Sequence, residues 1–154
     1  MDRVTVGWRE WVSLPELGID QIKAKVDTGA RTSSLHAYNI LSFSQQGRSL
    51  VRFYLHPFQR QSSPAVLCEA PLIDERMITS SSGHRERRYV IETRLRIGQV
   101  EWPIEVTLTN RDEMGFRMLI GRQAMRRRLV VDPGSSYKLS KPRRRQQKPV
   151  EGKE

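Results

Sequence analysis

The sequence has only one cysteine, no long hydrophobic run and a low hydrophobic content of 37%. A single cysteine, Cys68, excludes an internal disulfide and is typical of a protein from a reducing compartment. No apolar run approaches the roughly 18 residues that a membrane-spanning helix needs. Residues 1–4 lack the basic segment and apolar stretch of a secretory signal. These absences predict a cytoplasmic protein with no membrane partner, in which Cys68 is a buried, unreactive thiol.

Two common cofactor motifs are also missing. No His-Glu-x-x-His zinc motif occurs, and His36, His56 and His84 are the only histidines. No Gly-x-x-x-x-Gly-Lys-Ser/Thr loop is present to bind a nucleotide phosphate. The sequence therefore predicts no cofactor. One alternative is a zinc ion bound by His36, His84, Cys68 or carboxylates that the fold brings together, for which no spacing in the sequence gives evidence.

The net charge of +10 is concentrated towards the C-terminus. Residues 138–154 contain seven Lys and Arg against two Glu, which gives +5, and they contain few apolar residues. Such a segment cannot bury enough surface to order itself. We therefore expect one domain over residues 1–137 and a basic disordered tail over residues 138–154. The alternative is that Arg143, Arg144 and Arg145 contact nucleic acid or an acidic protein.

Alternation of apolar and polar residues predicts β-strands through most of the chain. The clearest strand runs from Val100 to Thr109, and Pro103 within it predicts an edge position or a bulge. Residues 89–97 repeat the pattern, and Gly98-Gln99 predicts a tight hairpin turn between the two. Further strands are expected over residues 4–12, 19–26, 35–43, 50–55, 65–72 and 129–131. Loops are expected over residues 56–64 and 79–84, followed by a charged cluster at 85–88.

One helix is expected, from Gly121 to Leu129, because this segment contains good helix formers. Many short strands with turn signals and one late, short helix predict an all-β closed barrel.

The tripeptide Asp27-Thr28-Gly29 directly follows the strand expected over residues 19–26. Three residues match by chance in many proteins, and their ordinary interpretation is an Asx turn in which Asp27 bonds to its own backbone. The context favours a catalytic interpretation. A strand leads into the tripeptide, small residues follow it, and Met-Leu-Ile-Gly-Arg at residues 118–122 opens the expected helix about ninety residues later.

With these segments, the chain resembles the bacterial family labelled ATP-dependent zinc proteases, whose domain is retropepsin-like. The matching segments are residues 7–12 (GWREWV), 25–37 (KVDTGARTSSLHA), 81–84 (SSGH), 107–111 (TLTNR), 118–122 (MLIGR) and 131–133 (VDP). The resemblance implies a retropepsin-like (acid protease) barrel with aspartic endopeptidase activity and Asp27, Thr28 and Gly29 as its catalytic residues. Its label implies zinc and ATP, and family members neighbour ATP-grasp enzymes that ligate glutamate to ribosomal protein.

The chemistry of aspartic proteolysis predicts a homodimer. The reaction needs two carboxylates that share a proton, one acting as general base on a water and the other polarising the scissile carbonyl. This sequence has one Asp-Thr-Gly, so a second copy must supply the second carboxylate across a two-fold axis. The family pattern implies that the Thr28 hydroxyl pins the loop, and Gly29 permits close approach of backbone.

Substrate contacts are expected from Ala30 and Arg31 beside the tripeptide. Residues 79–88 are expected to form a flap over the substrate, with Ser82, Gly83 and His84 at its tip; the turn at 98–99 and an ordinary exposed loop are the alternatives. Basic residues near the site favour an acidic substrate such as a glutamate-extended protein tail; they are Lys23, Lys25, Arg31, Arg85, Arg87, Arg88 and Arg111. The competing hypothesis is a non-catalytic β-barrel module that binds RNA, ribosomal protein or an acidic partner through its basic surface.

Overall fold

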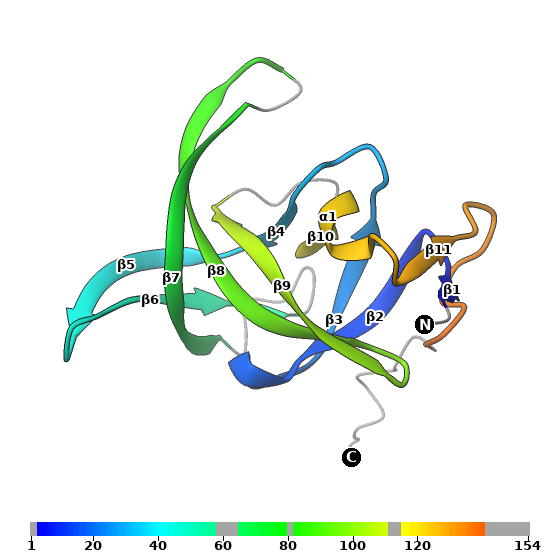
Figure 1. Ribbon diagram of the computed structural model, residues 1–154, viewed down its shortest axis with the longest axis horizontal. Helices are drawn as coiled ribbons and strands as arrows, with labels where there is room; N and C mark the ends of the chain where they lie inside the picture. Colours follow the sequence, from blue (N-terminus) through cyan, green and yellow to red (C-terminus); the bar gives the residue numbers. More distant parts are fainter. Residues whose placement is uncertain (1–2, 58–64, 80–81, 111–114, 141–154) are drawn as a thin grey trace, which may run out of the picture.

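The computed structural model describes residues 3–57, 65–79, 82–110 and 115–140, and most of these residues are in β-strands (Figure 1). The elements in chain order are β1 (Val4–Val6), β2 (Arg9–Leu14), the 3-10 helix η1 (Pro15–Leu17), β3 (Ile19–Val26), β4 (Ser33–His36), β5 (Tyr38–Gln45), β6 (Arg48–Leu55), β7 (Val66–Thr79), β8 (Arg85–Ile97), β9 (Val100–Thr109), β10 (Met118–Ile120), α1 (Arg122–Met125) and β11 (Leu129–Val131). This architecture confirms the predicted all-β fold with one short helix near its C-terminal end. Within the described part of the chain, no helix is long and apolar enough to cross a membrane.

Nine strands form one sheet in the order β2-β3-β10-β4-β9-β8-β7-β6-β5. A further pairing of β2 with β8, at Ser13 and Arg96, closes the sheet into a ring. The remaining strands, β7 to β5, extend beyond this closure, and β1 pairs with β11 in a separate parallel sheet. Figure 1 shows the long β7–β8 hairpin curving away from the ring and α1 lying against the ring near β10.

The core fills the ring with one face of each strand, as the sequence alternation predicts. In β9 the apolar residues of the even positions, Trp102, Ile104, Val106 and Leu108, are all buried. They pack in one cluster with buried side chains of the neighbouring strands, such as Leu95. Burying apolar area in this way supplies the main driving force for the fold.

Two local predictions about the β8–β9 hairpin are confirmed. Ile97 pairs with Val100, and Gly98 between them adopts a φ of +59°, which residues with a side chain rarely adopt. Pro103 pairs with Arg94 of β8 on one side. On its other side β9 meets β4 only from Val106 onward, so Pro103 lies at a locally open edge where no N–H is required.

The strands expected over residues 65–72 and 89–97 are longer than predicted. Residues 73–78, for which no element was expected, extend β7 together with Thr79 of the expected loop. The expected charged cluster at 85–88 extends β8, through the pairs from Asp74–Val90 to Thr79–Arg85. The outer part of this hairpin projects from the ring, so it has no buried face and no apolar alternation to detect. Its backbone ladder and cross-strand ion pairs such as Arg87–Glu75 define it instead.

Three other expected elements have different bounds. The helix predicted over residues 121–129 is only Arg122–Met125, because Arg127 takes a left-handed φ of +67° that ends it. The strand expected over residues 4–12 divides into β1 and β2, and the one expected over residues 35–43 divides into β4 and β5. Of the loop predicted over residues 56–64, positions 58–64 lie outside the described residues.

Candidate active site

Asp27 lies in a turn at the end of β3, and hydrogen bonds fix both its backbone and its side chain. Its N–H donates to the carbonyl oxygen of Ile120 (2.9 Å), and its own carbonyl accepts from the N–H of Ala30 (3.2 Å). The N–H of Gly29 donates to Asp27 Oδ1 (2.9 Å). The Asx turn expected as the ordinary interpretation is therefore present. It also holds one carboxylate oxygen in place while leaving the side chain half-exposed.

The two motifs that suggested an aspartic peptidase lie side by side. β10 is inserted between the two strands that the Asp27 turn connects: it runs parallel to β3, with Ile120 opposite Val26, and antiparallel to β4. Because β10 lies between two strands, the apolar side chains of Met118 and Ile120 are both buried. Gly121 and Arg122, which follow β10 in the sequence, therefore lie next to the turn.

Gly121 is required at this point by the close approach of the backbone. A Cβ on Gly121 would lie 2.5 Å from the carbonyl oxygen of Thr32, and its N–H donates to Ser33 Oγ (3.0 Å). The next residue, Arg122, donates its N–H to Ala30 O (2.8 Å) and its Nη1 to Thr28 O (3.0 Å). The hydrogen bonds of residues 120–122 thus hold the Asp27 turn in position.

Thr28 and Gly29 are exposed at the surface of the turn. The Thr28 hydroxyl forms no hydrogen bond with another residue that the structure describes. The structure therefore leaves this hydroxyl and the adjoining backbone accessible to a second molecule.

The Asp27 carboxylate faces a cavity of about 920 Å³ between its turn and the projecting β7–β8 hairpin. The cavity is lined by Asp27, Gly29, Ala30, Arg31, Thr32, Ser34, Arg76, Met77, Ile78, Thr79, Arg88, Glu105, Leu119 and Gln123. Of the predicted substrate-binding residues, Ala30 and Arg31 are thus brought together with Asp27. Ser82, Gly83 and His84 lie at the end of the hairpin and are not among the lining residues.

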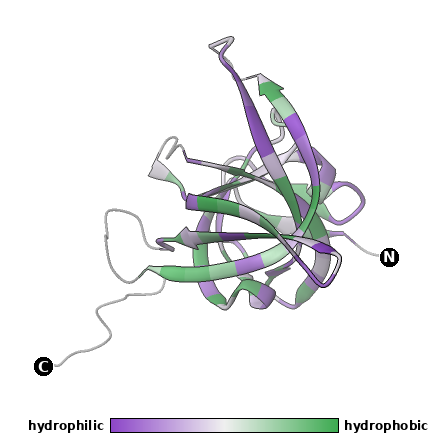
Figure 2. Ribbon diagram, turned by 90° about the vertical axis from the view of Figure 1, so that its left-hand side faces the viewer, coloured by the Kyte–Doolittle hydropathy of each residue, from purple (hydrophilic) through white to green (hydrophobic). Residues whose placement is uncertain are grey.

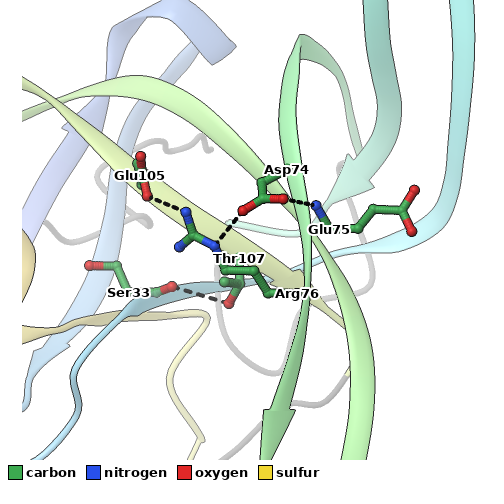
Figure 3. Close-up of polar contacts among 6 residues, drawn as sticks. All are labelled: Ser33, Asp74, Glu75, Arg76, Glu105 and Thr107. Carbon is green, nitrogen blue, oxygen red and sulfur yellow. Dashed lines mark hydrogen bonds and ion pairs between the residues drawn. The ribbon is translucent and has the colours of Figure 1, made fainter.

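Sequence reasoning missed the contribution of the hairpin strands, above all Arg76 and Glu105. Arg76 on β7 lies between Asp74, at 2.7 Å, and Glu105 of β9, at 3.0 Å (Figure 3). The hydrogen bond to Asp74, with a further one to Glu105, raises the pKa of Arg76 above its ordinary value. The same Arg76 bond, together with the N–H of Glu75, lowers the pKa of Asp74. No sequence signal marks this cluster, because it arises from the register of three strands.

A second ion pair fixes Arg88, the residue opposite Arg76 on β8. Arg88 Nε lies 3.1 Å from a Glu86 carboxylate oxygen, and Arg88 Nη1 donates to Thr107 Oγ1 (3.4 Å). Thr107 Oγ1 in turn donates to Ser33 O (3.2 Å), which ties the hairpin to the strand after the Asp27 turn (Figure 3). Among the described residues, three guanidinium groups line the cavity, and protein carboxylates neutralise two of them, those of Arg76 and Arg88. Arg31, the third, has no ion pair with a described residue.

The buried carboxylate of Glu10 joins two segments that lie behind β3, the strand that leads to Asp27. Glu10 is fully buried and accepts hydrogen bonds from the N–H of Gly7 (2.7 Å), from the N–H groups of Lys138 to Ser140 (2.7–3.2 Å) and from the Ser140 hydroxyl (2.6 Å). Trp8, which lies between Gly7 and Glu10 in the sequence, accepts at its carbonyl oxygen a hydrogen bond of 2.7 Å from the N–H of Val26, the residue before Asp27. The segments around residues 7–12 and 131–140 thus meet in space behind the Asp27 strand.

The residues considered for zinc do not assemble into a site. Among the described residues, no three His, Cys, Asp or Glu side chains are grouped so that they could hold a metal ion. Cys68 is buried, and burial raises the pKa of its thiol to about 12. The donor set in this part of the chain therefore does not fit a zinc centre.

The ring-like sheet, the short helix and the Asp-Thr-Gly turn define a retropepsin-like domain. The protein-family model described as "RimB-like: Retropepsin-like aspartic endopeptidase RimB" matches residues 5–142. The chain therefore belongs to the RimB-like family. This description names neither zinc nor ATP, so the label of ATP-dependent zinc protease is not supported.

Curated relatives share this domain within longer chains. A protein named "Probable alpha-L-glutamate ligase" from Desulfotalea psychrophila is 52% identical over 128 residues, which cover 83% of this chain and 28% of the relative. One of the same name from Parasynechococcus marenigrum is 49% identical over 137 residues, covering 89% of this chain and 29% of the relative. The chain thus spans less than a third of the length of these relatives.

A solved structure shares the fold. The crystal structure of Lpg0085 from Legionella pneumophila, a protein of unknown function, superposes with a TM-score of 0.77 at 26% identity. The match covers 90% of this chain and all of that one.

Proposed function

We propose that this chain is an aspartic endopeptidase of the retropepsin type that acts as a homodimer. The observation that carries the proposal is the half-exposed Asp27 carboxylate, held by Gly29 at the edge of a cavity of about 920 Å³ that a long hairpin borders. One such turn supplies one carboxylate. A second copy, related by a two-fold axis beside the exposed Thr28 and Gly29, supplies the other.

In the dimer, the two Asp27 side chains share one proton, since two like charges so close together cannot both ionise. The ionised carboxylate takes a proton from a water, which attacks the scissile carbonyl carbon. The protonated carboxyl group gives its proton to the carbonyl oxygen, so that a tetrahedral diol forms. The C–N bond then breaks as the proton taken from the water passes to the leaving nitrogen, and a diol hydroxyl returns one proton to the carboxylate pair. Gly29 N–H orients the carboxylate, and the Ile120 and Gly121 backbone keeps the turn in position.

The β7–β8 hairpin is the proposed flap, with Ser82, Gly83 and His84 at its tip. Figure 2 shows hydrophilic residues along the projecting end of β8, where Arg85 to Arg88 lie, and hydrophobic residues near the end of β7. Met77 and Ile78 line the cavity and offer apolar contacts to a peptide. Ala30 and Arg31 contact the substrate from the opposite side.

Acidic peptides, including glutamate-extended protein tails, are the proposed substrates. Arg31 lines the cavity, and no carboxylate of the described residues pairs with it. The relatives named as glutamate ligases favour a glutamate-bearing protein as the target. On the same ground, a glutamate ligase is the proposed partner protein. We place the end of the peptidase domain after Ser140, because Glu10 binds residues 138–140; the basic residues that follow are the proposed contact to nucleic acid or an acidic protein.

The alternative function is a non-catalytic module that binds RNA or an acidic protein through its positive charge of +10. Replacement of one side chain separates the two. Asp27→Asn removes the carboxylate and keeps the shape, whereas Asp20→Asn changes an exposed aspartate on the same strand as a control. We expect wild type and Asp20→Asn to cleave a glutamate-rich peptide and Asp27→Asn to be inactive, with equal melting temperatures. Equal inertness of all three proteins, with RNA binding that weakens steeply with salt, supports the alternative.

A further inference from the structure

The surface that has to meet a second copy is basic. Thr28 and Gly29 mark this surface, since they are the exposed residues next to Asp27. Arg31 and Arg122, both exposed, flank them on the two sides of the turn. The bond from Arg122 Nη1 to Thr28 O (3.0 Å) holds one guanidinium directly against the turn. Figure 1 shows the helix that begins with Arg122 beside the segment joining β3 to β4.

No described carboxylate neutralises these two arginines. Neither Arg31 nor Arg122 takes part in an ion pair with a residue that the structure describes. Glu105 also lines the cavity, but it is paired with Arg76. The turn therefore carries two positive charges against the single negative charge of Asp27.

Bringing two Asp27 turns together places four guanidinium groups around two carboxylates. Each copy also carries a net charge of +10. Like charges repel over about 10 Å at an ionic strength of about 0.1 M, and more strongly in the partly desolvated space of an interface. The surface that forms the paired site thus opposes its own assembly.

An acidic peptide would remove this opposition. The cavity opens beside Arg31 on each copy, so a bound peptide places its carboxylates among the cationic side chains that repel one another. We infer that dimerisation at the Asp27 turn is coupled to binding of an acidic peptide, so that the paired site assembles on its substrate. This inference rests on the proposed function and adds a regulation of the same site.

The coupling is reciprocal by thermodynamic linkage: a peptide that tightens the dimer also binds the dimer more tightly than it binds the monomer. The repulsion between the two turns also determines how the strength of the dimer interface depends on salt. An interface built on complementary charges weakens as salt rises, whereas this one tightens, because salt screens a repulsion.

Sedimentation equilibrium on the full chain tests the inference. The dimer dissociation constant is measured at about 0.02 M and about 0.5 M salt, and at the lower salt with hexaglutamate or hexaglutamine added. Mass spectrometry after each run establishes that the peptide is intact. For the wild type we expect the constant to fall by about tenfold at the higher salt and with hexaglutamate, and to be unchanged with hexaglutamine.

A charge-matched pair of variants locates the effect. Arg31→Gln combined with Arg122→Gln removes two charges from the turn, and Arg31→Gln alone leaves the bond to Thr28 intact. Arg48→Gln combined with Arg96→Gln removes two exposed charges elsewhere, at the ends of β6 and β8. Both turn variants should dimerise more tightly than wild type at low salt, and the control pair should follow wild type.

Three results overturn the inference: a dissociation constant independent of salt, one that rises with salt, or equal effects of hexaglutamate and hexaglutamine. If any of these occurs while Asp27-dependent cleavage is observed, the inference fails and the proposed function stands. If the wild type stays monomeric under every condition and cleaves no peptide, the proposed function fails as well.

Discussion

The backbone N–H of Asp27 donates a hydrogen bond of 2.9 Å to the carbonyl oxygen of Ile120, about ninety residues further along the chain. This bond joins the two motifs that the fold places in adjacent parallel strands. The position of the Asp27 carboxylate therefore depends on the backbone at residues 120–122 as much as on its own turn.

Gly121→Ala should disturb this support. The added Cβ would meet backbone atoms of Thr32 at 2.5–2.9 Å, and backbone cannot move aside as a flexible side chain can. We expect a loss of about 1–3 kcal/mol in the free energy of unfolding, measured by urea denaturation, together with a loss of peptidase activity. Gly134→Ala is the control, because its Cβ would meet only Asp132 Oδ1, at an ordinary 3.6 Å. Equal stability of the two variants would show that the close approach at Gly121 is unimportant.

Glu10→Gln tests the brace behind the Asp27 strand. The glutamine keeps the size of the side chain but replaces an accepting oxygen with an amide that faces N–H donors. Because the site is fully buried, we expect a loss of about 3 kcal/mol in stability. Amide hydrogen exchange should also become faster at residues 138–140. Glu16→Gln, at an exposed position of the 3-10 helix, should change neither measurement. Unchanged exchange at residues 138–140 in Glu10→Gln would contradict this role.

Arg76→Gln tests the ion pairs that fix the hairpin over the cavity. Loss of the bonds to Asp74 and Glu105 should let the hairpin move relative to β9, which raises KM and speeds hydrogen exchange in β7. Arg87→Gln is the matched control, since Arg87 pairs with Glu75 on the same hairpin and does not line the cavity. Identical KM values for the two variants would argue against a role of Arg76 at the site.

The same ion pair gives a pH dependence. The pKa of Asp74 is lowered in the fold, so its ionised form stabilises the hairpin above the ordinary value of 3.8, and this contribution is lost as pH falls through the lowered pKa. Exchange in β7 of the wild type should therefore approach that of Arg76→Gln under acidic conditions. A pH-independent difference between the two proteins would contradict this assignment.

Cys68 should be unreactive in the folded protein. Burial raises the pKa of its thiol from 9.0 to about 12, so the reactive thiolate is scarce at neutral pH. The neutral thiol is favoured in the fold, which gives stability below pH 9 that is lost as pH rises towards 12. Ellman's reagent at pH 8 should label the unfolded chain rapidly and the native protein slowly. Equal labelling rates would show that Cys68 is accessible.

The regular part of the fold could be predicted from the sequence because its signals are local. Alternation over Val100 to Thr109 identified β9, and Gly98 identified the turn before it. The projecting ends of β7 and β8 could not be found in this way, because neither face is buried there and their charged residues have no periodicity. The helix was predicted too long, since nothing in the composition of residues 126–129 shows the left-handed backbone at Arg127.

The candidate site likewise contains residues that the sequence identified and residues that it could not identify. Asp27, Ala30 and Arg31 were found because they are contiguous with a motif. Arg76 and Glu105 were missed because they are 29 residues apart and meet only through the pairing of β7, β8 and β9. Strand register is set by the whole sheet, and no local window of sequence contains it.

The central claim is that each active site takes one Asp27 from each of two chains, and subunit mixing tests it most directly. Wild-type protein is incubated with increasing amounts of Asp27→Asn, with Asp20→Asn as the control, under conditions where subunits exchange, and peptide cleavage is measured at a constant amount of wild type. Mixed dimers hold a single carboxylate, so activity should fall towards zero as Asp27→Asn is added in excess, and it should not fall with Asp20→Asn. Activity that stays constant at every ratio of Asp27→Asn would show that one chain is sufficient and would contradict the paired site.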